Sequence, residues 1–85
     1  MTAISLKFII NGEQVIVDFD AQTVIVSERG SQTSLASLLL KIGIDQTKKG
    51  IAVAVNETVV SKSKWEAEKI TEGDSIEIIR AVQGG

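Results

Sequence analysis

Few side chains in this sequence could do chemistry, so its last two residues attract attention first. The sequence has no cysteine and no histidine. Their absence excludes disulfides, thiolate or imidazole catalysis and the usual zinc sites. The sequence closes with "RAVQ" and then Gly84 and Gly85. Either this glycine pair is an end without a role, or the α-carboxylate of Gly85 is itself the functional group.

The carboxylate side chains do not suggest an enzyme. No Asp or Glu stands in a paired spacing that singles it out, and solvated surface charge is the better interpretation. The segment from Glu72 to Asp74 brings two carboxylates together around a glycine. Gly and Asp are preferred in turns for backbone reasons, so we interpret this segment as a turn. We expect no catalytic residue, no metal site and no bound cofactor.

Composition places the chain among small globular domains. It has 85 residues, of which 44% are hydrophobic and 24% charged, with a net charge of −2 and no basic block. We therefore expect no nucleic-acid partner and no membrane partner. The longest apolar stretch, "IAVAV", is too short to span a bilayer, and no secretory signal is recognisable. These features favour a cytoplasmic protein with one domain over residues 1–85.

The first half predicts a hairpin and a helix. Apolar residues alternate along 4–10 and again along 13–19, and Asn11-Gly12 between them is the strongest short hairpin signal. Residues 23–26 are β-branched, and we leave open whether they form a second hairpin or a bulged continuation. The segment 34–43 predicts a helix, because Leu35, Leu38, Leu39 and Ile42 form one apolar stripe. Thr33 or Ser34 would cap this helix and Gly43 would end it.

The second half predicts further strands. "IAVAVNETVV" indicates two strands around a turn at Asn56-Glu57, the first of them apolar on both faces and so interior. Ser63 and Glu66 have the spacing of a capping box, which predicts that one short helical turn opens there. We expect Trp65 and Ile70 to fold inward. The last strand begins after Gly73-Asp74 and leads directly into the glycines.

This order of elements predicts an α+β fold of the β-grasp (ubiquitin-like) type. Its mixed sheet would have four to five strands, with one main helix across one face. A last strand in the middle of the sheet would anchor a flexible tail over 82–85.

Several segments resemble the ThiS family, the sulfur carriers of thiamine (thiazole) biosynthesis. The "AVAVN" strand and turn, the Val-Val pair, the Trp after a Ser, "EGDSIEI" and "AVQGG" carry the resemblance, which "ING" and "SLASLLLKIGI" extend to the first half. Two departures stand against it. The stretch from Asp20 to Val26 is longer than expected, and Ser61-Lys62 replaces the Pro-Arg that often precedes the Trp element.

Other functions share this fold and ending. The small subunit of molybdopterin synthase (the MoaD family) and ubiquitin-like protein modifiers also end on Gly-Gly. A plain β-grasp interaction domain is the remaining alternative.

The resemblance implies a carrier that is a co-substrate and not an enzyme. An E1-like adenylyltransferase (ThiF-like) would use MgATP to adenylate Gly85, and sulfur derived from a cysteine desulfurase would give a thiocarboxylate. Thiazole synthase (ThiG-like) would then take the sulfur. Gly84 and Gly85 would enter the partner's active site, since glycine adopts backbone shapes that other residues avoid.

A docking surface for that partner follows from the alternation in the last strand. Ile76 and Ile78 share one face, whereas Ile79 and Ala81 share the other. If the helix covers the Ile78 side, Ile79, Ala81 and Val82 form part of a docking surface beside the tail. The alternative is that they are covered by a loop or are ordinary scattered surface residues.

Overall fold

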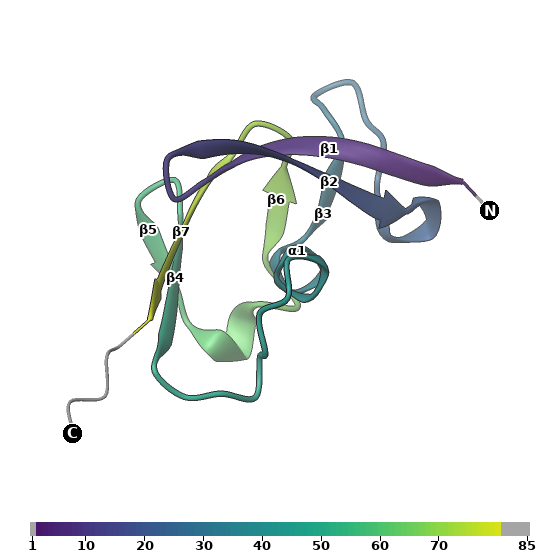
Figure 1. Cartoon of the computed structure of the whole chain (residues 1–85). Helices are drawn as coiled ribbons and strands as arrows, with labels where there is room; N and C mark the ends of the chain where they lie inside the picture. Colours follow the sequence, from purple (N-terminus) through teal and green to yellow (C-terminus); the bar gives the residue numbers. More distant parts are fainter. Residues whose placement is uncertain (1, 81–85) are drawn as a thin grey trace.

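A computed structural model describes residues 2–80 of the chain (Figure 1). The elements follow the order β1 (Ala3–Ile10), β2 (Glu13–Asp20), β3 (Gln32–Ser34), α1 (Leu35–Lys41), β4 (Ile51–Val55), β5 (Thr58–Val60), β6 (Lys69–Thr71) and β7 (Ser75–Arg80). Two short 3₁₀ helices span Ala21–Thr23 and Lys62–Lys64.

Five of these strands form one mixed sheet in the order β2-β1-β7-β4-β5. β7 lies in its centre, parallel to β1 and antiparallel to β4. Figure 1 shows the strands curving around α1. The predicted α+β architecture, with a mixed sheet and one main helix, is therefore confirmed, and so is the central position of the last strand.

Both predicted hairpin turns are present, and both use left-handed backbone at their two central residues. The φ angles are +49° at Asn11 and +83° at Gly12, and +49° at Asn56 and +71° at Glu57. Positive φ at both positions matches the right-handed twist of the flanking strands. Asn and Gly tolerate this conformation, which explains why the Asn-Gly signal was reliable.

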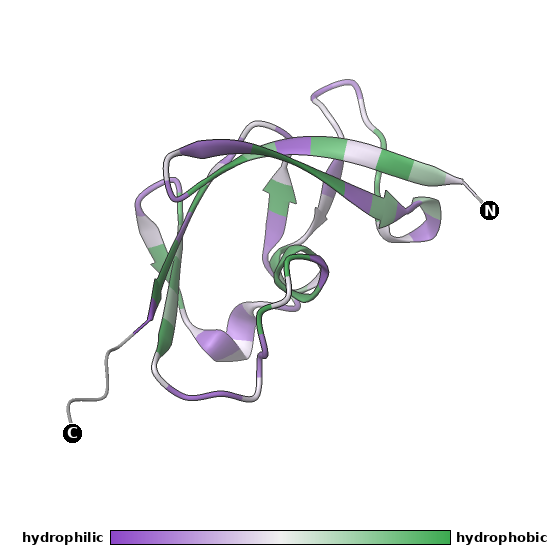
Figure 2. Cartoon of the chain, in the orientation of Figure 1, coloured by the Kyte–Doolittle hydropathy of each residue, from purple (hydrophilic) through white to green (hydrophobic). Residues whose placement is uncertain are grey.

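The core lies between α1 and the inner face of the sheet. Leu35, Leu38 and Leu39 of the helix are all fully buried, as the predicted stripe requires. On the sheet, the rings of Phe8 and Phe19 meet edge to face with centroids 6.3 Å apart, a favourable aromatic geometry. Figure 2 shows hydrophobic residues concentrated in the helix and strands, with hydrophilic residues prominent in the connecting loops.

The predicted helix ends are confirmed. Ser34 is the N-cap residue of α1, and its hydroxyl accepts a hydrogen bond from the Ser37 amide. Gly43 has a φ of +86°, the left-handed conformation expected just beyond a helix end.

Trp65 is buried as predicted, but the capping box is wrong. The short helical turn spans Lys62–Lys64, so Ser63 lies inside it, and the residue before it, Ser61, makes no side-chain cap. The turn is fixed instead by the indole of Trp65, which is 2% exposed and donates from Nε1 to the Val60 carbonyl at 3.0 Å. A buried indole N–H needs such a partner.

The β-branched residues 23–26, whose structure the sequence left open, do not form a regular strand. Residues Ala21–Thr23 make a 3₁₀ turn, and Ile25 forms only an isolated bridge to Gln32. The chain then enters β3, which pairs with β6 in a separate two-stranded sheet. Neither β3 nor β6 was predicted, because each has only three residues and, unlike β5, is not joined to its partner strand by a tight turn.

Adjacent leucines in α1 provide a test of this packing. Leu39 is fully buried, whereas Leu40 is 70% exposed. We expect Leu39→Ala to lower the free energy of unfolding by about 2–5 kcal/mol, because it leaves a cavity in the core. Leu40→Ala should change it by less than about 0.5 kcal/mol. Urea denaturation of both variants measures the difference, and equal losses would contradict the placement of the helix.

Candidate functional site

The strand β7 connects the core to the residues that sequence reasoning placed at the centre of function. Its register with β4 runs from Ile76 opposite Val55 to Arg80 opposite Ile51. The described residues end at Arg80. Gly84 and Gly85, the predicted reactive tail, lie outside them, as do Ala81 and Val82. The structure therefore describes the site as far as Arg80, the last residue of β7.

The two faces of β7 differ as predicted. Ile76 is fully buried and Ile78 is partly buried against the core, so both face α1. Ile79 is 54% exposed and lies on the opposite face of the sheet. The prediction that Ile79 lies on an open face is confirmed, whereas its docking role stays a prediction.

Ile79 has apolar neighbours on this outer face. In antiparallel pairs, directly opposed residues project from the same side of the sheet. Ala52 is opposite Ile79, and Ala54 is opposite both Glu77 and Val59. Val59 is 72% exposed. We call Ile79, Ala52, Ala54 and Val59 the outer-face patch.

Sequence reasoning missed most of this patch, although a signal was present. The alternation in "IAVAV" shows that Ala52 and Ala54 share a face. Only the register of β4 with β5 and β7 places that face beside Ile79 and Val59.

Charges differ between the two ends of β7. Glu72 and Asp74 precede its start, and Arg80 is its last residue. Ile51 lies opposite Arg80, and Lys48 and Lys49 come just before it in the chain. Arg80, Lys48 and Lys49 therefore all lie at, or close in sequence to, the last residue pair of β7 and β4, the end of β7 that leads to the tail.

One acidic group lies near these lysines. The hydroxyl and amide of Thr47 donate hydrogen bonds to the Asp45 carboxylate, and with the nearby charges of Lys48 and Lys62 they lower the pKa of Asp45. The carboxylate therefore stays ionised near neutral pH and partly balances the lysines.

The acidic residues around Gly73 stabilise a loop. The Glu72 carboxylate accepts from the Lys7 amide at 3.0 Å, and the Asp74 carboxylate accepts from the Thr71 amide at 2.8 Å. Gly73 has a φ of +95°. The predicted turn is confirmed, and residues 2–80 contain no cluster of His, Cys, Asp or Glu that could hold a metal ion.

The comparisons with known proteins agree with this geometry. A model of the ThiS family matches residues 6–85. The chain belongs to the ThiS family. The match includes the longer stretch after β2, the Ser61-Lys62 departure and both terminal glycines, and it supports a role as a sulfur carrier in thiamine biosynthesis.

The fold of this ThiS-family chain is similar to a crystal structure described as thiamine biosynthesis protein (ThiS) from Geobacter metallireducens. The TM-score is 0.66 at 19% sequence identity, over 94% of this chain and 100% of the other. At this identity the likeness shows the β-grasp fold alone. A search of curated proteins found no match. Within residues 2–80, no helix has the length and apolar character needed to cross a bilayer.

If β7 is the rigid support for the tail of this ThiS-family protein, its amides should exchange slowest. A strand paired on both sides opens only with much of the sheet, whereas β5 lies at a sheet edge. We expect the amides of Ile76 and Glu77 to exchange at least about tenfold more slowly than those of β5. Hydrogen exchange followed by NMR measures this. Faster exchange in β7 than in β5 would show that the support is not rigid.

Proposed function

We propose that this protein carries sulfur as a thiocarboxylate on Gly85 and donates it to the thiazole ring of thiamine. The observation that carries the proposal is the ThiS-family match, which continues through Gly85. The fold supports it, because Gly85 follows only five residues after the end of the central strand β7.

The chemistry requires activation of the carboxylate. An α-carboxylate has a pKa of about 3.3–3.7, so it is ionised near neutrality and resists nucleophiles. A carboxylate oxygen of Gly85 attacks the α-phosphorus of ATP, and pyrophosphate leaves. A sulfide equivalent then adds to the carbonyl of the acyl adenylate and AMP leaves, so that one oxygen is replaced by sulfur.

The protein itself acts as co-substrate, and its partners supply the catalytic groups. A ThiF-like adenylyltransferase binds MgATP, a cysteine desulfurase together with a thiol reductant provides the sulfur at the sulfide level, and a ThiG-like thiazole synthase receives it. All three steps belong to the cytoplasm, where ATP and reduced sulfur are available. Residues 81–85 span at most about 18 Å, which is enough for Gly84 and Gly85 to enter an active site while β7 stays outside.

The outer-face patch is the docking surface for the adenylyltransferase in this proposal, together with Ala81 and Val82. Fixing the tail in an active site costs about 1–2 kcal/mol of backbone entropy per residue. Contacts made by the folded body offset part of that cost. Complete burial of a side chain such as Ile79 contributes about 1.5–3 kcal/mol.

The thiocarboxylate can be detected by intact-protein mass spectrometry. After incubation with ATP, a sulfur donor and the partner enzymes, we expect the mass to rise by about 16 Da, since sulfur replaces oxygen. A variant with one alanine appended after Gly85 should show no gain, because the activated carboxylate is displaced from its position.

Two outcomes would contradict the proposal. One is an unchanged mass in the presence of competent partners. The other is the appearance of conjugates joined to lysines of other proteins, which would identify a protein modifier instead.

The docking surface can be tested with two isoleucines of the same sheet face. Ile79→Ala should raise the KM for activation by about 5–30-fold, the effect of losing roughly 1–2 kcal/mol of buried apolar contact. The control is Ile16→Ala. Ile16 is 67% exposed and lies on β2, two strands away from β7. A KM that rises equally in both variants would rule out a specific role for Ile79.

A further inference from the structure

We propose that Asn11 is a positioning residue that fixes the end of β7, so that the tail leaves the domain from a constant place. The proposal rests on the proposed function, because it concerns how the tail is presented to a partner. The supporting observation is that the Asn11 side chain forms hydrogen bonds to β7 that the hairpin turn itself does not require.

The parallel pairing of β1 with β7 is short. Only two residue pairs are in register, Ile9 with Ser75 and Ile10 with Ile76. The chain then turns at Asn11, whose backbone amide still donates to the Ile76 carbonyl at 2.9 Å. Beyond this bond, the backbone of β1 no longer pairs with β7.

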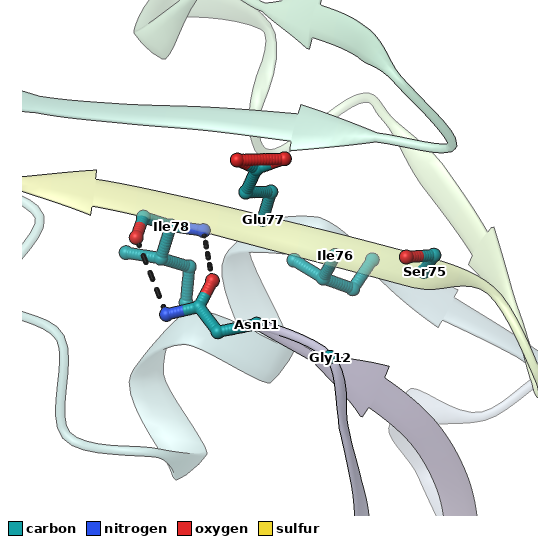
Figure 3. Close-up of a pocket in the computed structure, with 6 residues that line it drawn as sticks. All are labelled: Asn11, Gly12, Ser75, Ile76, Glu77 and Ile78. Carbon is teal, nitrogen blue, oxygen red and sulfur yellow. Dashed lines mark hydrogen bonds between the residues drawn. The ribbon is translucent and has the colours of Figure 1, made fainter.

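The side chain of Asn11 continues the pairing by one peptide (Figure 3). Its Oδ1 accepts from the Ile78 amide at 2.7 Å, and its Nδ2 donates to the Ile78 carbonyl at 3.3 Å. The side-chain amide thus presents one acceptor and one donor to Ile78, as a peptide group of a neighbouring strand would. Ile78 is two residues before Arg80, where the described strand ends.

Asn is the residue type that can both adopt the left-handed turn conformation at position 11 and pair with the backbone of Ile78. The φ of +49° at Asn11 favours Asn, Asp or Gly. Glycine has no side chain, and an ionised aspartate has acceptors but no donor. Only asparagine combines the left-handed turn with a donor and an acceptor for Ile78.

The other hairpin turn provides an internal comparison. Asn56 has the same φ of +49°. Its Oδ1 accepts from the Ser75 amide at 2.9 Å, and its Nδ2 donates to Asp74 Oδ1 at 3.2 Å. Asn56 therefore fixes the start of β7, whereas Asn11 fixes the part nearest the tail.

Loss of the Asn11 side chain should let the end of β7 open more often. Its edge groups at Ile78 would then have only water as partners, and local opening would be easier. A partner that binds the tail would have to order additional backbone each time, which weakens binding without changing the bound complex. The expected kinetic effect is therefore on KM and not on kcat.

The test compares Asn11→Gly with Asn56→Gly in the full chain. Both keep a residue that adopts positive φ, and each removes two side-chain hydrogen bonds at one end of β7. In N11G we expect the Ile78 amide to exchange about tenfold faster and the KM for ATP-dependent activation to rise by a similar factor, with kcat unchanged. In N56G, the Ser75 amide should exchange faster while the Ile78 amide and KM stay as in the wild type.

Asn11→Asp is the second variant, and it decides the question if N11G fails to fold. It retains a turn-compatible residue of the same shape and an acceptor for the Ile78 amide, but its second carboxylate oxygen takes the place of the donor and repels the Ile78 carbonyl, which should loosen the end of β7. We expect faster Ile78 exchange and a higher KM here too. An N11D protein that equals the wild type in both would overturn the proposal, and so would equal KM increases in N11G and N56G.

Failure of the proposed function is distinguishable from failure of this inference. A wild-type protein that gains no mass with competent partners overturns the carrier function. Exchange of the Ile78 amide needs no partner. Unchanged exchange in N11G would overturn the role of Asn11 whatever the wild type does with ATP.

Discussion

The structure depends on the placement of its last strand in the middle of the sheet. β7 is parallel to β1 and antiparallel to β4, and Ile76 at its start is completely buried. Parallel neighbours cannot be joined by a tight turn, so the chain between β1 and β7 must cross over. The helix α1 and the β4–β5 hairpin lie in that crossover and also supply the core against which β7 packs. The order of elements along the chain follows from this requirement.

Within residues 2–80, the helix α1 covers the inner face of the five-stranded sheet and leaves its outer face uncovered. α1 contributes Leu35, Leu38 and Leu39 to the core on the inner side. On the outer side, Ile79 near the end of β7 and Val59 of the edge strand β5 stay exposed. Large apolar side chains grouped on an open face are typical of interaction surfaces. The same arrangement therefore buries the strand and leaves apolar contact area where a partner approaching the tail would meet it.

Sequence reasoning succeeded where structure is decided locally. The Asn-Gly turn, the leucine stripe of α1 and the alternation in β7 each depend on neighbours in the chain. It failed for β3 and β6, whose pairing joins Gln32 to Thr71, 39 positions apart in the sequence. The role of Asn11 was hidden for the same reason. Its turn is visible in the sequence, but its bonds to Ile78 join residues 67 positions apart and require the parallel register.

A carrier whose reactive atom belongs to its main chain has to control that atom through backbone geometry. No side chain at the proposed reaction centre can orient or activate Gly85, because glycine has none. Control must come from where β7 ends and how firmly it is held. The two hairpin asparagines meet this need from opposite ends of the strand, Asn56 at Ser75 and Asn11 at Ile78. Their amides act on backbone groups alone, so a chain without cysteine or histidine can still fix the point from which its tail departs.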